Sequence, residues 1–267
     1  MLHYKFYKAK VDTSQILILL HGFLSDSRTY RDHIDTYTNI CHVVTIDLPG
    51  HGEDKSSADV DWNFDYITES LDQILEQYKD KSISMLGYSM GGRVALYYAL
   101  HGRIKLANLI LESTSPGIKL EADQLERRHI DEARAKVLEI AGIEVFVNDW
   151  EKLPLFQTQY QLSEEKQHQI REQRLSQSPV KMAKALRDYG TGQMPNLWSQ
   201  IAELKMPVLI LAGEYDEKFV QIAEKMANLI SNSKCKLFSA VGHTIHVEDN
   251  VEFDTMILGF LKEEQND

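Results

Sequence analysis

The chain has 267 residues, of which 43% are hydrophobic and 26% are charged, a composition typical of a soluble globular protein. No apolar run approaches the roughly 20 residues that span a bilayer, so a membrane span is excluded. The formal charge of -11 argues against a nucleic-acid partner, because phosphates require a basic surface. A small anionic substrate stays open, since a few arginines in a cleft can bind it.

The start of the chain and its cysteines bear on the cellular compartment. The first residues mix charged and aromatic side chains and lack the zones of a secretory signal, so we expect a cytoplasmic protein. Cys41 and Cys235 lie far apart and lack the paired spacing of a zinc or redox motif, so we expect reduced structural thiols. The sequence does not predict whether the protein is a monomer or a homo-oligomer.

Several apolar runs are typical of strands that are buried on both faces of a sheet. In chain order they cover residues 15–20, 42–46, 82–86, 106–112 and 207–212. Helical periodicity separates some of these strands, over residues 66–78 and 92–100. This alternation predicts an α/β fold with a mostly parallel central sheet flanked by helices, and functional groups at the carboxyl ends of its strands.

The alternation breaks between about residues 115 and 207, where strand-like runs are scarce. Segments rich in Glu, Arg, Gln and Lys predict helices there, over residues 124–141, 143–150, 164–177 and 180–189. Because this stretch follows a buried strand, we expect it to cover the strand ends as a helical cap inserted before the last strands. The expected division is a core of residues 1–115 and 200–267 and a cap of residues 116–199.

The motif Gly87-Tyr88-Ser89-Met90-Gly91 points to nucleophile or base chemistry. It follows an apolar strand and begins a helix, which predicts the sharp turn that exposes a serine hydroxyl. We interpret Ser89 as an activated hydroxyl. The alternative is a glycine-rich turn with an idle serine.

A serine hydroxyl needs an imidazole to take its proton and a carboxylate to orient that imidazole. After this type of turn the chain order is acid and then histidine. Asp216 lies just past the last buried strand and His243 belongs to a Gly-His pair near the C-terminus, so we expect them to be these partners. Alternatives are Glu214 and Glu217 for the acid, and His246 for the base.

Two histidine-bearing loops follow the first buried strands. His21-Gly22 is typical of an oxyanion loop, in which the backbone amides of Phe23 and Met90 donate to an oxygen that gains negative charge. The segment 47–52 contains a histidine but lacks the clustered ligands of a zinc site. We therefore predict a structural turn there and no metal.

Together these motifs resemble the α/β-hydrolase superfamily over essentially the whole chain, which implies an α/β-hydrolase fold but no particular reaction. A narrower resemblance lies in Gly-Tyr-Ser-Met-Gly-Gly-Arg together with residues 141–146 and 150–156. That combination resembles the 2-succinyl-6-hydroxy-2,4-cyclohexadiene-1-carboxylate synthases, the lyases that eliminate pyruvate in menaquinone biosynthesis. The resemblance implies 2-succinyl-5-enolpyruvyl-6-hydroxy-3-cyclohexene-1-carboxylate as substrate and no cofactor.

The same resemblance implies which residues hold this substrate, a small molecule with several carboxylates. The matching positions are Arg93, Arg127 and Arg174 for the carboxylates and Tyr88, Trp150 and Phe156 for the aromatic pocket. Arg93 lies one helical turn after Ser89 and so near the same face. Arg128 and Arg171 are alternatives to Arg127 and Arg174, and ordinary surface ion pairs are an alternative role for all cap arginines.

The resemblance further implies that Ser89 acts as a base and forms no acyl-enzyme. His243 would draw the proton from Ser89, whose oxygen would remove the ring proton next to the succinyl ketone. The oxyanion hole would hold the enolate, which then expels pyruvate. A serine hydrolase of a small ester, thioester or carbon-carbon bond would use the same triad with water. A binding protein on a hydrolase scaffold is a further alternative, disfavoured by the complete Ser, Asp and His set.

Overall fold

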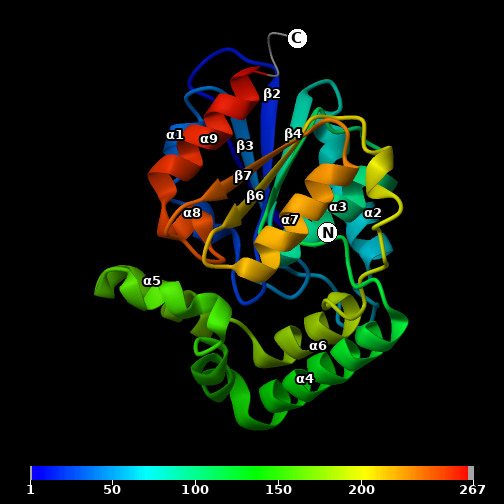
Figure 1. Cartoon of the computed structure of the whole chain (residues 1–267), viewed down its shortest axis with the longest axis vertical. Coiled ribbons are helices and arrows are strands. Elements are labelled where there is room, and N and C mark those ends of the chain that lie inside the picture. Colours follow the sequence, from blue (N-terminus) through cyan, green and yellow to red (C-terminus); the bar gives the residue numbers. More distant parts are fainter. Residues whose placement is uncertain (1, 264–267) are drawn as a thin grey trace.

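The structure is a computed structural model that describes residues 2–263. A seven-stranded sheet runs through the molecule in the order β1-β3-β2-β4-β5-β6-β7 (Figure 1). β1 is antiparallel to β3, and the other neighbouring strands are parallel. The strands are β1 (His3–Tyr7), β2 (Gln15–Leu20), β3 (His42–Asp47), β4 (Ser82–Tyr88), β5 (Asn108–Glu112), β6 (Val208–Gly213) and β7 (Ser233–Phe238). The predicted mostly parallel sheet is confirmed.

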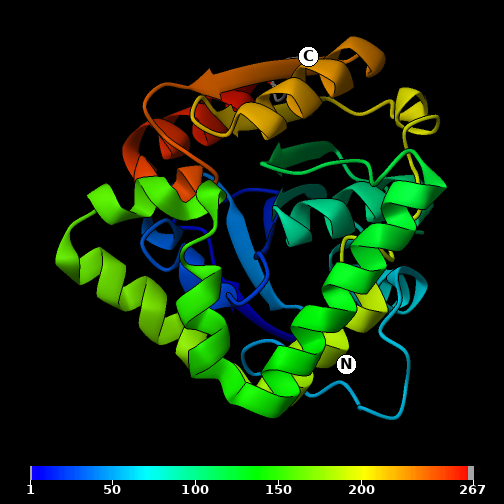
Figure 2. The same ribbon diagram turned by 60° about the horizontal axis from the view of Figure 1, so that its bottom comes forward.

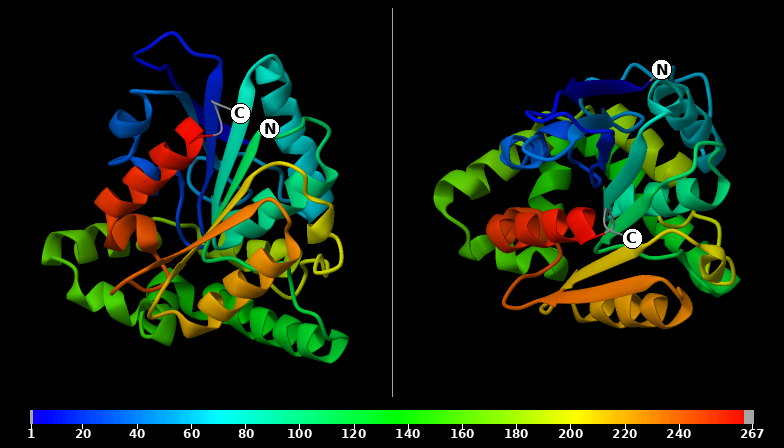
Figure 3. Two further views of the ribbon diagram at one scale, coloured as in Figure 1. Left: turned by 45° about the horizontal axis from the view of Figure 1, so that its top comes forward. Right: turned by 90° about the horizontal axis from the view of Figure 1, so that it is seen from above.

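Helices cover both faces of this sheet, as expected for strands that are apolar on both sides. In β2, Ile16, Ile18 and Leu20 pack on one face, and Leu17 and Leu19 pack on the other. The first face carries α2 (Phe64–Leu75), α3 (Met90–His101) and α7 (Glu217–Leu229), and the second carries α1 (Ile34–Tyr37) and α9 (Asn250–Glu263) (Figures 1 and 3). Shorter helices are η1 (Ser27–Tyr30), η2 (Glu76–Tyr78), η4 (Ile201–Glu203) and α8 (Ile245–Glu248).

A third group of helices lies between β5 and β6 in the chain. These are α4 (Glu121–Trp150), η3 (Pro154–Gln161), α5 (Glu164–Leu175) and α6 (Pro179–Tyr189). They lie together beyond one end of the sheet, drawn in green to yellow-green (Figures 1 and 2). Leu138 of α4 and Met182 of α6 share an apolar cluster with Leu24, which belongs to the loop after β2. The exact division into core and cap residues stays a prediction.

The structure differs from the expectations in two places. The two helices expected at 124–141 and 143–150 form one element, α4, with a kink at Gly142, whose φ of 82° is readily adopted by glycine. The edge strands β1 and β7 carry no continuous apolar run and were not predicted. β7 is only partly buried, because an edge strand has a neighbour on one side only.

Within residues 2–263, no helix combines the length and the apolar character that a membrane crossing requires.

Candidate active site

Ser89 lies in the turn between β4 and α3, at the end of the middle strand of the sheet. Its φ of 50° and ψ of -104° are strained for a residue other than glycine. The Ser89 amide donates to the carbonyl of Glu112 at 2.8 Å, and Thr114 Oγ1 donates to the Ser89 carbonyl at 2.8 Å. These bonds from the end of the neighbouring β5 hold the turn in the conformation that presents the hydroxyl.

Two glycines allow the backbone segments around Ser89 to approach each other. A Cβ on Gly87 would lie 2.3 Å from the carbonyl oxygen of Gly91, and a Cβ on Gly91 would lie 2.3 Å from the carbonyl oxygen of Leu20. Leu20 is the last residue of β2, directly before the predicted oxyanion loop. Gly91 therefore sets how closely the serine turn and this loop pack.

Ser89, His243 and Asp216 form a chain of hydrogen bonds. His243 Nε2 lies 3.0 Å from Ser89 Oγ, and His243 Nδ1 lies 2.5 Å from Asp216 Oδ2. Both His243 and Asp216 are buried. The carboxylate holds the proton on Nδ1, so Nε2 is free to accept the proton of the serine hydroxyl.

The alternative acid and base residues lie elsewhere. Glu214 and Glu217 are exposed and do not contact the imidazole of His243. His246 is fully buried and its Nδ1 bonds to Glu112. The structure thus brings together the three residues that sequence order selects.

His21 organises the loop that follows β2. Its Nε2 accepts a hydrogen bond from the Leu48 amide at 3.0 Å, so Nδ1 carries the proton and donates to the carbonyl of Gly22 at 2.8 Å. Because carbonyl and amide point in opposite directions across a trans peptide, the Phe23 N–H points away from this imidazole. Within residues 2–263 the amides of Phe23 and Met90 have no acceptor, and both residues line the cavity beside Ser89. Both amides are therefore available to an oxygen that gains charge.

A cavity of about 390 Å³ opens onto Ser89 and His243. Four cationic side chains line it, and among the described residues no Asp or Glu does. In a chain with a net charge of -11, this lining is a local reversal of sign. Such a cavity suits an anion with more than one carboxylate. The cationic residues are Arg93, Arg127, Arg134 and Lys218.

Arg93 is a cation without an ion pair among the described residues. Its Nε is buried and has no hydrogen-bond partner within residues 2–263. Burial, followed by the nearby positive charge of Arg127, lowers the pKa of Arg93 to about 10, so the guanidinium stays charged at neutral pH. Since an unpaired buried charge is costly, its position favours a ligand carboxylate as the missing partner.

The structure distinguishes between the two adjacent arginines of α4. Arg127 lines the cavity and pairs with Asp131, Nε to Oδ1, at 2.9 Å. Arg128 is not part of the lining and donates to the carbonyl of Gly192 at 2.8 Å. Arg127 therefore fits the predicted substrate role and Arg128 does not.

Two cationic lining residues were missed from the sequence. Arg134 lies two helical turns after Arg127, its Nη1 is 3.8 Å from Asp131 Oδ1, and its guanidinium is 5.3 Å from the centroid of the Trp150 ring. The spacing of seven residues along α4 would have indicated the shared face. Lys218 follows Asp216 by two residues in α7, and no motif in the sequence singles it out.

Arg174 lies beside the cavity and is not part of its lining. Its Nη1 pairs with Glu151 at 3.2 Å and its Nη2 donates to Gln159 at 2.8 Å. The alternative, Arg171, pairs with the same Glu151 at 2.6 Å. Phe156 separates Arg174 from the substrate cavity, with its ring centroid 4.8 Å from the guanidinium, so the substrate role of Arg174 stays a prediction.

The three aromatic residues predicted for the pocket all line the cavity. Tyr88 is held by a hydrogen bond of 2.9 Å between its hydroxyl and Thr244 Oγ1. Burial keeps the pKa of Tyr88 far above its ordinary range, so this hydroxyl stays neutral. Trp150 Nε1 is buried without a partner among the described residues, which leaves it free to donate to a ligand. Phe156 packs against His243, with ring centroids 6.1 Å apart.

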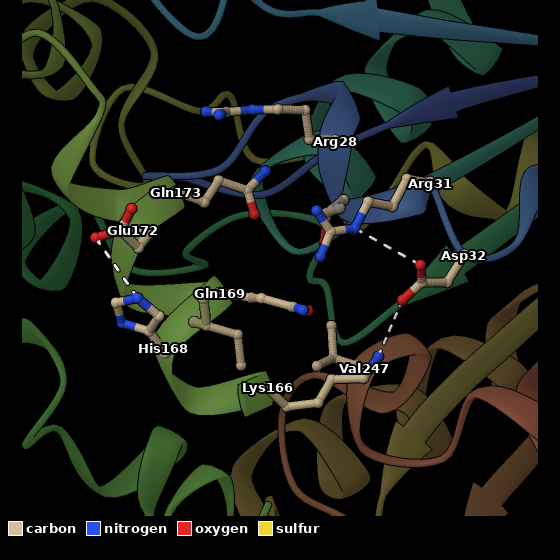
Figure 4. A pocket seen from close by; sticks show the side chains of 11 residues that line it. Arg28, Arg31, Asp32, Lys166, His168, Gln169, Glu172, Gln173 and Val247 are labelled. Atoms are coloured by element: carbon tan, nitrogen blue, oxygen red, sulfur yellow. Dashed lines mark hydrogen bonds and ion pairs between the residues drawn. The ribbon is translucent and has the colours of Figure 1, made fainter. Parts of the chain in front are cut away.

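A second cleft, of about 340 Å³, lies between the η1 region and α5 (Figure 4). Its charges neutralise one another. Asp32 lies 3.6 Å from Arg31 and 3.2 Å from Lys166, and Arg28 pairs with Asp26 at 2.7 Å. None of the triad residues lines this cleft, so we assign the substrate to the cavity at Ser89.

The sheet order, the serine turn and the triad together are those of an α/β hydrolase. A family model described as alpha/beta hydrolase fold matches residues 15–250, and the chain belongs to this family.

Comparisons with individual proteins narrow the class. The chain is 34% identical to a putative 2-succinyl-6-hydroxy-2,4-cyclohexadiene-1-carboxylate synthase of Bacillus subtilis, over 94% of this chain and 91% of that protein. It is 27% identical to the synthase of Escherichia coli O139:H28, over 87% and 88% of the two chains. The solved structure of MenH from S. aureus is 76% identical, with a TM-score of 0.98 over 99% and 100% of the chains. The chain is therefore a member of the 2-succinyl-6-hydroxy-2,4-cyclohexadiene-1-carboxylate synthase family, and the family prediction is confirmed.

Proposed function

We propose that the protein is a lyase of menaquinone biosynthesis. It eliminates pyruvate from 2-succinyl-5-enolpyruvyl-6-hydroxy-3-cyclohexene-1-carboxylate and gives 2-succinyl-6-hydroxy-2,4-cyclohexadiene-1-carboxylate. The observation that carries this proposal is the position of Ser89 and His243 in a cavity with four cations and no carboxylate among its described lining residues. A hydrolase of neutral esters would have a mainly apolar pocket, and the buried Nε of Arg93 would then lack a partner.

Ser89 acts as the base in this reaction. His243 Nε2 takes the hydroxyl proton across 3.0 Å while Ser89 Oγ removes the ring proton next to the succinyl ketone. The electron pair of the broken C–H bond moves onto the ketone oxygen. Asp216 stabilises the imidazolium that forms.

The oxygen that gains charge accepts hydrogen bonds from the amides of Phe23 and Met90. When the enolate collapses, the carbon-oxygen bond to the enolpyruvyl group breaks, and the leaving enolate becomes pyruvate on taking up the proton that His243 holds, which returns the imidazole to its neutral form. Ser89 returns to its hydroxyl form and is never acylated. The ketone already acidifies the ring proton, so the reaction needs no cofactor.

The remaining lining residues bind and orient this multi-carboxylate substrate. Arg93 lies nearest to Ser89 in sequence and holds one carboxylate, and Arg127 and Arg134 on α4 hold another. Trp150 Nε1 donates to the substrate, and Tyr88 and Phe156 flank it. We retain Arg174 as a candidate that would contribute only after it leaves Glu151. A cytoplasmic location is part of the same proposal.

Release of pyruvate from the enolpyruvyl precursor tests the function. Pyruvate is followed through reduction by lactate dehydrogenase, with an enzyme-free sample to subtract spontaneous elimination. We expect rapid release by the wild type and a loss of at least about 10³-fold in Ser89→Ala, as for removal of a triad serine. The matched control is Arg128→Ala, which should retain activity because this residue lies outside the cavity. A wild-type rate equal to the enzyme-free rate would refute the assignment.

The hydrolase alternative is tested on the same preparations. A series of small esters and thioesters is offered at equal concentration, and hydrolysis is compared with pyruvate release. Hydrolysis of a neutral ester that exceeds lyase turnover and is unaffected by Arg93→Ala would favour the alternative.

A further inference from the structure

A buried, hydrogen-bonded pair of residues lies close to the triad but outside it. The side chains of His246 and Glu112 are both 0% exposed. His246 Nδ1 lies 2.9 Å from one oxygen of Glu112 and 3.0 Å from the other, and the His246 amide donates to the same carboxylate at 3.1 Å. One carboxylate thus fixes both the imidazole and the backbone of His246.

This pair is bonded to the segment that carries the nucleophilic hydroxyl. Glu112 is the last residue of β5, and its carbonyl accepts the amide of Ser89 at 2.8 Å. The ring of Tyr88, which precedes Ser89, packs edge-on against His246 with centroids 4.8 Å apart. Any displacement of Glu112 therefore moves the backbone that presents Ser89.

The pair is also bonded to the segments that carry the other catalytic groups. His246 lies three residues after His243, at the second position of α8. Its Nε2 lies 2.8 Å from Thr29 Oγ1 in η1, the helix that follows the oxyanion loop. Three segments that are distant in sequence therefore meet at His246 and Glu112.

Glu248 anchors the histidine loop in a different way. Its carboxylate accepts the amides of Gly242 at 2.6 Å and Thr244 at 3.1 Å, on either side of His243. These bonds shape the loop locally but do not link it to β5. The bond of His246 to Glu112 joins the loop to the strand end that holds Ser89, and a separate bond of 2.9 Å joins Thr244 Oγ1 of the loop to the hydroxyl of Tyr88.

We propose that Glu112 and His246 are positioning residues, which hold His243 at hydrogen-bond distance from Ser89. Neither residue lines the substrate cavity, so they act through the triad and not on the substrate. Loss of either partner leaves the other buried without its counterpart, and the histidine loop then shifts relative to the serine turn. The inference rests on the proposed role of Ser89 and His243 as the base.

The test compares His246→Leu, His246→Asn and Glu112→Gln in the full chain. Asn retains a donor toward Glu112, and Gln retains an acceptor for His246, whereas Leu retains neither. The matched control is Asn108→Ala, which breaks a buried hydrogen bond at the other end of β5, from Asn108 Nδ2 to Ser84 Oγ at 3.0 Å. For each variant we measure kcat and KM for pyruvate release, the melting temperature, and the downfield proton NMR signal of His243 Nδ1–H.

We expect His246→Leu to lower kcat by about 10²-fold, because a misplacement of about 1 Å costs this much, while KM stays the same. Its His243 signal should shift or broaden. His246→Asn and Glu112→Gln should recover part of kcat and of the signal. Asn108→Ala should lower the melting temperature but leave kcat and the signal unchanged.

The proposal is overturned if His246→Leu and Glu112→Gln are less stable but keep the wild-type kcat and His243 signal, because the pair is then structural only. If His246→Leu does not fold, Glu112→Gln and His246→Asn decide by the same criteria. If the wild type releases no pyruvate, the proposed function fails, and the His243 signal alone decides on the positioning role.

Discussion

Replacement of Arg93 with methionine should stabilise the protein and inactivate it. Methionine fills similar space without a charge. The pKa of Arg93, about 10, lies more than two units below the ordinary value of a guanidinium, and each unit corresponds to about 1.4 kcal/mol. The unfavourable free energy of burying this charge is thus about 3 kcal/mol at most, and about 1–3 kcal/mol if cavity water solvates part of the group.

This penalty should be constant over the ordinary pH range. A cation with a lowered pKa is charged in both the folded and the unfolded state below about pH 10, so the destabilisation is fully present there and declines only above that pH. The melting temperature of Arg93→Met should therefore rise by roughly 2–12 °C at neutral pH, given about 2–4 °C per kcal/mol for a chain of this size. Circular dichroism melting measures this rise.

The same substitution removes the partner of a substrate carboxylate. Loss of one side of a buried, hydrogen-bonded charge pair costs about 3–4 kcal/mol, which predicts a fall of about 10²–10³-fold in kcat/KM for pyruvate release. Arg128→Met is the control and should keep kcat/KM within about twofold, like an ordinary surface substitution. If Arg93→Met melts below the wild type and retains its kcat/KM, Arg93 is a structural helix residue and the assignment of a ligand carboxylate to it is wrong.

Three further perturbations test other parts of the site. Arg127→Ala and Arg134→Ala should each lower kcat/KM by roughly 10-fold with small effects on the melting temperature, because both arginines face the cavity and share Asp131. Rates equal to the wild type would show that these residues of α4 do not bind the substrate. Gly91→Ala should lower activity by about 10²-fold or more, since its Cβ would clash with the Leu20 carbonyl. The control is Gly259→Ala in α9, which should be active and equally or more stable because no atom lies within 4 Å of its Cβ. Burial lowers the pKa of His51 to about 3 in the folded protein, against about 6.5 in the unfolded chain. The stability that the neutral imidazole contributes is therefore fully present above about pH 6.5 and is lost as the pH falls toward 3. Urea unfolding at about pH 7 and pH 5 measures this loss. The unfolding free energy of the wild type should fall by about 2 kcal/mol more than that of His51→Asn over this interval, and equal falls would contradict the neutral state of His51.

The catalytic set could be predicted because its determinants are local or follow chain order. The turn at Ser89 depends on Gly87 and Gly91, which the sequence shows directly and which contact backbone in the structure. Asp216 follows from its position after a buried strand, because parallel strands bring their carboxyl ends to one edge, and His243 follows from its Gly-His pair and the chain order. Exposure of Glu214 and Glu217 could not be read from the sequence, and chain position alone favoured the correct acid.

The substrate residues were harder to predict because they depend on the rotation and packing of helices. Adjacent arginines at 127 and 128 point in directions about 100° apart on a helix, and only the packing of α4 on α6 determines which one faces the cavity. The pairing of Arg174 could not be predicted for another reason: its partners Glu151 and Gln159 belong to other segments of the chain, and the sequence does not show that they contact it. Edge strands such as β7 were missed because exposure removes the apolar run on which the prediction relied.

The cationic lining of the cavity also has a consequence for the end of the catalytic cycle. Both proposed products, pyruvate and the cyclohexadiene carboxylate, retain carboxylates after the carbon-oxygen bond breaks. The arginines that hold the substrate therefore attract the products as well, and their attraction does not weaken when the chemistry is complete. We expect departure of the products to limit turnover, and pyruvate to inhibit the enzyme by competing for the site from which it was released.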